Sequence, residues 1–200
     1  MRIEDMKSSF RKKKSISIVA VLLFFTFLFV NQITAKAGTG IVYGENGIIT
    51  RAEWLHDLAL IFEMSVEDEN YPDNYFSDLS GESEYYYDVL LTVQFGLIDV
   101  EAGGEIAPNE VVTREFAAHT LNFCLGYQLE ESESYTFDDA DNCSYPADAQ
   151  VALNREWFAA VNGMFSPEAE VTAGEVRKMI EDAQVVMQEM TVDEEYENQY

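Results

Sequence analysis

The sequence is poor in cysteine, histidine and positive charge. Two cysteines and two histidines in 200 residues are too few for a disulfide-rich scaffold or a Cys/His zinc module. Twelve Lys and Arg against 37 Asp and Glu give a formal net charge of −25. This balance excludes a general binder of nucleic acid or anionic membranes, because such partners need a cationic face. We expect no nucleic-acid partner, no metal site and no cofactor.

The apolar content is nevertheless that of a folded chain. Hydrophobic residues make up 48% of the sequence and aromatic residues 13%, more than a disordered acidic chain carries. Catalytic signatures are missing, since no G-x-S-x-G, P-loop or G-x-G-x-x-G pattern occurs. The many carboxylates follow from composition and do not indicate a paired acid and base. We therefore expect a folded, acidic protein that is not an enzyme.

The N-terminal segment has the three parts of a secretory signal peptide. Six basic residues lie within positions 1–14, an apolar run extends from Ile16 to Val30, and Ala35-Lys36-Ala37 is a small-x-small cleavage pattern. We predict a signal peptide over 1–37 and export of the mature chain, without a membrane contact after cleavage. The alternative is an uncleaved anchor, although the run falls short of the roughly 20 apolar residues that a membrane span needs.

Cleavage would make the mature chain still more acidic. It would remove seven of the 12 basic residues but only two of the 37 acidic ones, leaving a net charge of −30 on 163 residues. The remaining cations are Arg51, Arg114, Arg155, Arg177 and Lys178. Their positions are informative, because an anionic ligand needs local positive charge on so acidic a domain.

A repeat of about sixty residues organises the rest of the chain. A T-R-x-E-like motif starts at three threonines spaced by 63 and 59 residues, namely Thr50, Thr113 and Thr172. Two other landmarks recur in the same order before the second and third motifs. They are Phe76-Ser77-Asp78 with Phe137-Asp138-Asp139, and Ile106-Ala107-Pro108 with Phe165-Ser166-Pro167.

Each repeated threonine is predicted to be a helix N-cap. Thr50-x-x-Glu53 and Thr172-x-x-Glu175 fit the capping box, and Gly126 is placed to end the second helix. Shorter helices are predicted over 85–95 and 147–158, and the helical spacing around Trp54 places that residue in the core. The predicted fold is mainly α: repeated helix-turn-helix units packed around a bundle of three long helices, with few or no short strands.

This order of landmarks resembles the S-layer homology (SLH) repeat, which reads F-S-D-[VL], a short helix ending in G-[IL], F-x-P, and then [IV]-T-R-x-E-F. The best match lies within 76–126, with Phe76-Ser77-Asp78, Phe95-Gly96-Leu97-Ile98 and Thr113-Arg114-Glu115-Phe116. The resemblance implies an SLH-like region over 38–190, made of a partial repeat at 44–64 and full repeats at 76–126 and 137–190. Residues 191–200 would be an acidic tail or linker. The third copy carries Ala173 in place of the motif arginine.

The resemblance implies a function at the bacterial cell surface. Proteins of this family attach non-covalently to the cell wall by binding secondary cell-wall polysaccharide, often pyruvylated, in grooves between the repeats. The alternative is a degenerate structural or protein-interaction module of a surface adhesin or assembly, with other surface proteins as partners and no glycan binding. The degraded third copy favours this alternative.

Arg51 and Arg114 are the first candidate glycan-binding residues, because they occupy the same position of the repeat. A guanidinium at a helix start suits carboxylate recognition. Each could instead pair with a nearby carboxylate and order the helix start. Six residues after the repeated threonines come His56, His119 and Lys178. The two histidines are further candidates, with the alternative that each is a partly buried helix residue with one hydrogen bond.

Asp78 and Asp138 are candidates on the strength of the resemblance, which places the aspartate after the opening Phe near the ligand groove. An aspartate there can equally cap the following turn. Residues 138–142 resemble a calcium loop only superficially, since the required glycine and closing glutamate are missing. Cys124 and Cys143 form an even pair in a predicted secreted chain, which favours a disulfide; two separate thiols are the alternative.

Overall fold

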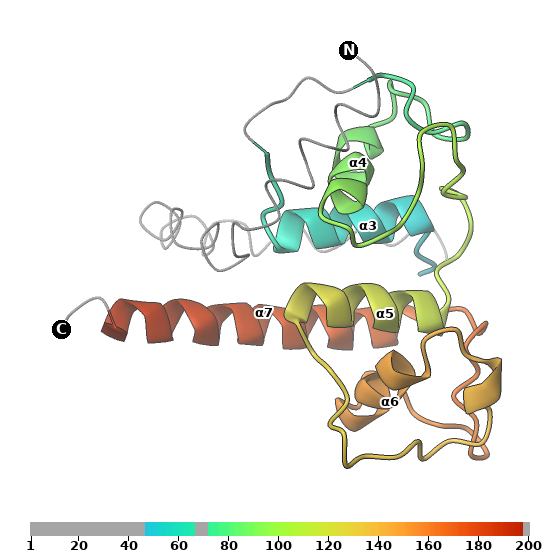
Figure 1. Ribbon diagram of the computed structural model, residues 1–200, viewed down its shortest axis with the longest axis vertical. Helices are drawn as coiled ribbons and strands as arrows, with labels where there is room; N and C mark the ends of the chain where they lie inside the picture. The colour runs from blue at the N-terminus through green and yellow to red at the C-terminus, as the bar shows by residue number, and fades with distance from the viewer. Residues whose placement is uncertain (1–46, 67–71, 198–200) are drawn as a thin grey trace. The chain divides into compact units, whose positions relative to one another are not determined.

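The computed structural model describes residues 47–66 and 72–197, so the predicted signal peptide lies outside the described residues. Within these ranges the regular elements are five α-helices and one 3₁₀ turn, joined by isolated bridges and without a strand. They are α3 (Arg51–Ile61), α4 (Tyr86–Gln94), α5 (Arg114–Leu125), η1 (Ala140–Asn142), α6 (Pro146–Asn154) and α7 (Ala173–Glu197) (Figure 1). The prediction of a mainly α fold is confirmed. None of the described helices combines the length and apolar character needed to cross a membrane.

The long helices begin at the residues that the repeat predicts. The Oγ1 atom of Thr50 accepts the backbone N–H of Glu53 at 3.3 Å, and the Glu53 carboxylate accepts the backbone N–H of Thr50 at 2.8 Å. Thr172 and Glu175 form the same reciprocal pair at the start of α7. Each capping threonine contributes about 1 kcal/mol to helix stability, because it satisfies a backbone donor that has no partner within the helix.

Helix α5 begins and ends with single-residue signals. Thr113 caps it through the hydroxyl alone, because Phe116 stands where the other copies have glutamate. The helix ends at Gly126, whose φ of 69° is left-handed. Glycine adopts this conformation without the steric cost that a side chain would add.

Each short helix packs against the long helix that precedes it in the chain. Helix α4 contacts α3 and α6 contacts α5, while α5 also contacts both α3 and α7 (Figure 1). The buried Trp54 of α3 donates its Nε1–H to Oγ1 of Thr120 on α5 at 2.8 Å, which confirms the core position predicted for this tryptophan. The helices that pack as a pair are therefore a long helix and the short helix after it, whereas in the sequence repeat a short helix comes before its long helix.

Neighbouring copies are joined at the starts of α3 and α5. The backbone N–H groups of Arg51 and Ala52 donate to the carbonyl groups of Glu110 and Pro108 at 2.8 and 3.1 Å. In the next copy, the backbone N–H groups of Arg114 and Glu115 donate in the same way to the carbonyl groups of Ala169 and Pro167, again at 2.8 and 3.1 Å. The proline-containing loop of one copy thus satisfies helix donors of the copy before it, since the first N–H groups of a helix lack partners inside it.

Two predicted helix ends differ from the structure. Helix α6 stops at Asn154 instead of continuing to Phe158, and Glu156 has a φ of 58°, a left-handed value that ends the helical path. Trp157 and Phe158 are therefore buried from a turn and not from a helix. Helix α7 continues through Glu197, past residue 190 where we expected the repeat region to end.

Candidate functional site

Arg51 crosses from the start of α3 to the second copy. Its Nε donates to the carbonyl of Ile106 at 2.8 Å, and its guanidinium lies 4.0 Å from the centre of the Phe116 ring. Burial lowers the pKa of Arg51, while the charges of Glu110 and Asp78 raise it, and the net change is a decrease. These contacts order the start of the helix.

Arg114 makes the equivalent crossing from the second copy to the third. The side chain is only 10% exposed; Nη1 donates to the carbonyl of Phe165 at 2.7 Å and Nη2 to the Glu175 carboxylate at 2.6 Å. Glu175 is the third residue of α7, and Phe116 is the third residue of α5. Both motif arginines therefore reach the same position of the next long helix, and Arg114 is committed to partners within the chain.

The aspartate of the opening motif holds the proline-containing loop. The carboxylate of Asp78 accepts the backbone N–H groups of Ile106 at 3.0 Å and of Ala107 at 2.7 Å. In the third copy these bonds are made by Asp139, which accepts from Phe165 at 2.7 Å and Ser166 at 2.8 Å.

The choice of Asp138 as the equivalent of Asp78 was therefore wrong by one residue. Asp138 stands at the position of Ser77, and both residues donate their backbone N–H to a glycine carbonyl, Gly163 and Gly104 respectively. The sequence signal that identifies the functional equivalent is the spacing: Asp78 and Asp139 both lie two residues after the opening Phe.

The two histidines join the long helices to the short ones. Nδ1 of His56 lies 2.5 Å from the carboxylate of Asp88 in α4, and Nδ1 of His119 lies 2.7 Å from that of Asp148 in α6. The His119 ring also stacks on Tyr145, with 3.6 Å between the ring centres. Each histidine is partly exposed and engages one carboxylate, as the alternative interpretation of these residues expects.

The two cysteines are separate thiols in the structure, so the favoured disulfide is not present. Cys124 lies on α5, and burial raises its pKa to about 12. Cys143 follows the 3₁₀ turn, with its Sγ 3.8 Å from the carbonyl of Asp139. Burial, together with the charges of Glu115 and Asp139, raises its pKa to about 11. An even cysteine count does not establish that two thiols meet.

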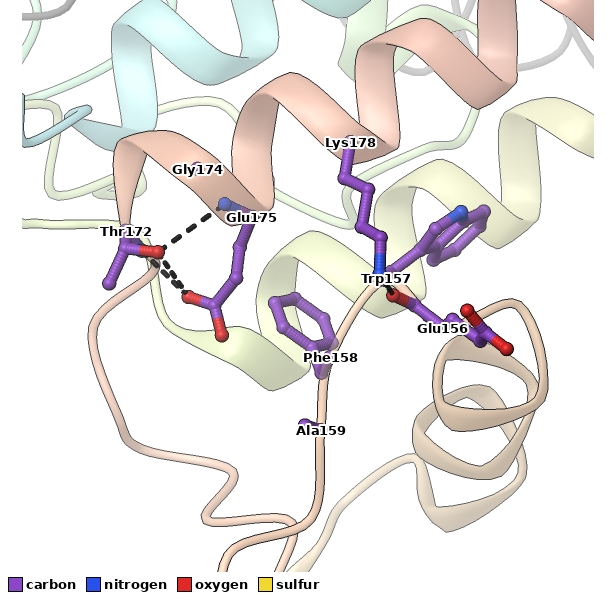
Figure 2. A pocket seen from close by; sticks show the side chains of 8 residues that line it. All are labelled: Glu156, Trp157, Phe158, Ala159, Thr172, Gly174, Glu175 and Lys178. Atoms are coloured by element: carbon purple, nitrogen blue, oxygen red, sulfur yellow. Dashed lines mark hydrogen bonds between the residues drawn. The ribbon is translucent and has the colours of Figure 1, made fainter.

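A cavity of about 490 Å³ opens between the turn after α6 and the first turns of α7. Figure 2 shows its lining: Glu156, Trp157, Phe158, Ala159, Thr172, Gly174, Glu175 and Lys178. Lys178 donates from Nζ to the backbone carbonyl of Glu156 and so spans the two walls. Only the capping motif and the third-copy cation Lys178 could have been found from the sequence, because the rest of the lining depends on where α6 stops.

The carboxylates of the cavity differ in their partners. Burial alone would raise the pKa of Glu175, but hydrogen bonds from Arg114 and Thr172 hold it below its ordinary value. The Glu175 charge is thus compensated by a buried guanidinium. Glu156 is exposed and uses only its backbone carbonyl in the bond to Lys178. No cluster of three His, Cys, Asp or Glu side chains suited to a metal ion occurs in the described part of the chain.

Comparison with known families identifies the second copy. Residues 75–117 match the sequence model of the S-layer homology domain. The match runs from the residue before Phe76 to the first turn of α5, and so contains Asp78, α4 and Arg114. No curated protein matches the chain. The first and third copies are related to the matched one by the repeated contacts described above.

Proposed function

The chain carries an S-layer homology domain, a module of cell-surface and cell-wall association, and from this premise we propose that it attaches non-covalently to secondary cell-wall polysaccharide. The exported, mature protein would bind the glycan in the cavity between 156–159 and the start of α7. Its role would be attachment without catalysis.

The cavity is the observation that supports this proposal. Its volume lies in the range of about 300–1,000 Å³ that is usual for small-molecule sites. Trp157 and Phe158 line the cavity but are only 1% and 4% exposed, so they offer little ring face for stacking. Lys178, Thr172 and Glu175 supply hydrogen-bonding groups around the start of α7, and these suit the hydroxyl groups at the edges of one or two sugar units.

A substitution of Gly174 tests the cavity directly. Gly174 lines the cavity, and a Cβ built on it would meet no atom closer than Oγ1 of Thr172 at 4.0 Å. We expect Gly174→Phe to fill the space and abolish co-sedimentation with isolated cell-wall sacculi. Gly174→Ala is the matched control, since it adds only a methyl group and should bind as the wild type does.

The two variants separate a failed site from a failed function. Wild-type binding together with binding by Gly174→Phe would place the glycan elsewhere on the domain. No binding by the wild type to sacculi that retain their polysaccharide would refute the attachment function itself. Circular dichroism of each variant tests whether the helix content of the wild type is preserved, so that lost folding is not mistaken for lost binding.

A protein-interaction module is the second candidate, and the motif arginines favour it. Arg51 and Arg114 are engaged within the chain, and the third copy has Ala173 at the equivalent position. A domain that uses its arginines to join its own copies can keep the fold without binding glycan. Capture of a purified surface protein by wild type that does not bind sacculi would support this candidate over the first.

A further inference from the structure

Helix α7 is about twice as long as the other two long helices. It has 25 residues, against 11 in α3 and 12 in α5. The Arg114–Glu175 pair holds the starts of α5 and α7 together, so the extra residues of α7 continue past the end of α5 (Figure 1). At a rise of about 1.5 Å per residue, the additional length is about 20 Å. The second half of α7 therefore extends beyond the helix that packs against its first half.

One side of α7 is exposed where the equivalent sides of α3 and α5 are buried. The fifth residue after the repeated threonine is Leu55 in α3 and Ala118 in α5, and both are fully buried. In α7 this position holds Arg177, which is exposed, as is Glu181 one turn later. Val185, one further turn along, is 51% exposed. The short helices α4 and α6 pack against α3 and α5, but no short helix follows α7 within the described residues. This side of α7 is thus open to another polypeptide.

The charges along α7 run opposite to the order that its own dipole favours. A helix is stabilised by acids near its start and by cations near its end. Apart from the capping Glu175, α7 does the reverse: Arg177 and Lys178 stand in its second turn, and its sequence ends in DEEYE. A second helix with the same charge order, running antiparallel, would bring acids to the cations at both ends. Helix α7 of a second copy of the chain has this order.

Arg177 and Glu195 are spaced to pair in such an arrangement. Residues 177 and 195 are five helical turns apart, so both stand on the same side of α7. In an antiparallel pair with twofold symmetry, Arg177 would meet the partner's Glu195, and symmetry supplies the reverse contact. The twofold axis would then pass near residue 186. Val185 stands close to that axis, so the exposed valines of the two copies would meet at the centre.

Arg177 has no hydrogen bond or ion pair in the part of the chain that the structure describes. The other cations in these ranges are engaged within the chain: Arg51, Arg114, Arg155 and Lys178. Inside the chain, an arginine of one long helix already binds a glutamate of another, as Arg114 binds Glu175. The same contact between two copies would use the cation that the fold itself leaves unpaired.

We propose that this side of α7 binds a second copy of the chain, with the two α7 helices antiparallel. The contact is mostly polar and spans about 27 Å of helix. We therefore expect a reversible dimer with a dissociation constant in the micromolar range, as is usual for small polar interfaces. Dimerisation does not require the glycan, so a failure of the proposed attachment would leave it untouched.

Two charge-reversal variants of the mature protein test this arrangement. Arg177→Glu places like charges opposite the partner's Glu195, and Glu195→Arg places them opposite the partner's Arg177. Each variant alone should dimerise at least about tenfold more weakly than the wild type in sedimentation equilibrium. An equimolar mixture of the two should recover dimers, because both contacts of an antiparallel pair then join opposite charges. Added salt should weaken the wild-type dimer by screening these contacts.

Glu189→Arg is the matched control, since it makes the same charge change on another side of α7. Glu189 is exposed and lies a third of a turn away from the row of Arg177 and Glu195. The variant should dimerise no more weakly than the wild type, and it should recover no dimers when mixed with Arg177→Glu. Val185→Asp should weaken the dimer, because two carboxylates would meet near the axis.

The mixing experiment decides the proposal. A wild type that stays monomeric up to millimolar concentration would overturn it. A dimer that Arg177→Glu leaves unchanged would place the contact elsewhere, and a mixture of the two variants without dimers would exclude the antiparallel pairing. Recovery with Glu195→Arg but not with Glu189→Arg would support it. Misfolding does not produce that pattern, because mixing two misfolded chains would not restore a dimer.

Discussion

The guanidinium of Arg114, the first residue of α5, lies 2.6 Å from the carboxylate of Glu175, the third residue of α7. The pair connects two copies of the repeat, and Glu175 at the same time caps its own helix through Thr172. Between the first and second copies the same joint is made by Arg51 over the ring of Phe116. One geometry thus uses an ion pair in one place and a cation–π contact in the other.

Breaking the Arg114–Glu175 pair should strongly destabilise the domain. Glu175→Gln leaves the buried guanidinium without its counter-charge, which costs about 3 kcal/mol. The pKa of Glu175 is lowered in the folded state, so the pair stabilises the fold above its ordinary pKa of 4.5 and this stability is lost as the pH falls below that value. The difference in the free energy of unfolding between the wild type and Glu175→Gln, measured by urea denaturation, should therefore become smaller at acidic pH.

The Arg155–Asp182 pair is the matched control. It is more exposed, with 35% of the arginine side chain accessible, so Arg155→Ala should cost less than about 1 kcal/mol. Two outcomes would contradict a structural role for the buried pair. One is an equal loss of unfolding free energy in Glu175→Gln and Arg155→Ala. The other is a loss in Glu175→Gln that stays the same from pH 7 to pH 3.

The helix starts could be predicted because their signals are local. Thr50 with Glu53, and Thr172 with Glu175, bond over three residues, so the sequence itself contains both partners. The left-handed Gly126 is likewise a property of one residue. The repeat then carried these signals from copy to copy and predicted a mainly α fold.

The cavity and the roles of the arginines could not be predicted, because they depend on partners far apart in the sequence. Arg114 finds Glu175 only when the third copy packs against the second. The backbone of Glu156 is left-handed at the position where the preceding copy has Gly96. The residue type does not predict this conformation, because a glutamate rarely adopts it. The register of Asp139 was available from the spacing after Phe137, but the adjacent Asp138 obscured it.

Asp139 and Asp138 should differ sharply in their effect on stability. Asp139 is 4% exposed and accepts two backbone N–H groups, so Asp139→Ala leaves two donors unsatisfied and should cost about 2–4 kcal/mol. Asp138 is exposed, and Asp138→Ala should change the free energy of unfolding by less than about 0.5 kcal/mol. Thermal denaturation of both variants checks this. Similar losses of unfolding free energy in the two variants would show that Asp138 also holds the proline-containing loop.

The two thiols should be separately titratable and slow to react. Burial raises the pKa of Cys124 to about 12, so little thiolate exists at pH 8 and iodoacetamide should modify the native protein slowly. In denaturant without reductant both thiols should be modified, and mass spectrometry should count two adducts. Protein that takes up no label under those conditions would contain the disulfide after all.

Asp57 should destabilise the fold near neutral pH. Its Oδ2 is buried without a hydrogen-bond partner among the residues that the structure describes, and burial, opposed by the charge of His56 and reinforced by that of Glu53, raises the pKa of Asp57 from 3.8 to about 6. A folded-state pKa above the unfolded one means that stability falls as the pH rises from about 4 to 6 and stays lower above that. Asp57→Asn removes the charge and should stabilise the protein by about 1–3 kcal/mol at pH 8.

The pH dependence of this gain is the decisive measurement. At pH 4 the wild-type carboxyl is already protonated in the folded state, so the advantage of Asp57→Asn should largely disappear. Asp99→Asn is a control at an exposed position and should have little effect at either pH. A gain of the same size at pH 4 and pH 8 would mean that the charge of Asp57 is not its cause.

Glu156 and Gly96 should respond in opposite ways to an exchange of residue type. Both have left-handed backbones, with φ of 58° and 77°, at equivalent ends of α6 and α4. A Cβ on Gly96 would touch no atom within 4 Å, so the loss of about 1 kcal/mol that we expect for Gly96→Ala is conformational alone. Glu156→Gly should relieve the same strain and stabilise the domain by about 0.5–1 kcal/mol.

Because Lys178 bonds to the backbone carbonyl at 156, the cavity should keep its shape in this variant. Glu156→Gly that is less stable than the wild type would show that the glutamate side chain makes a contact whose loss outweighs the strain.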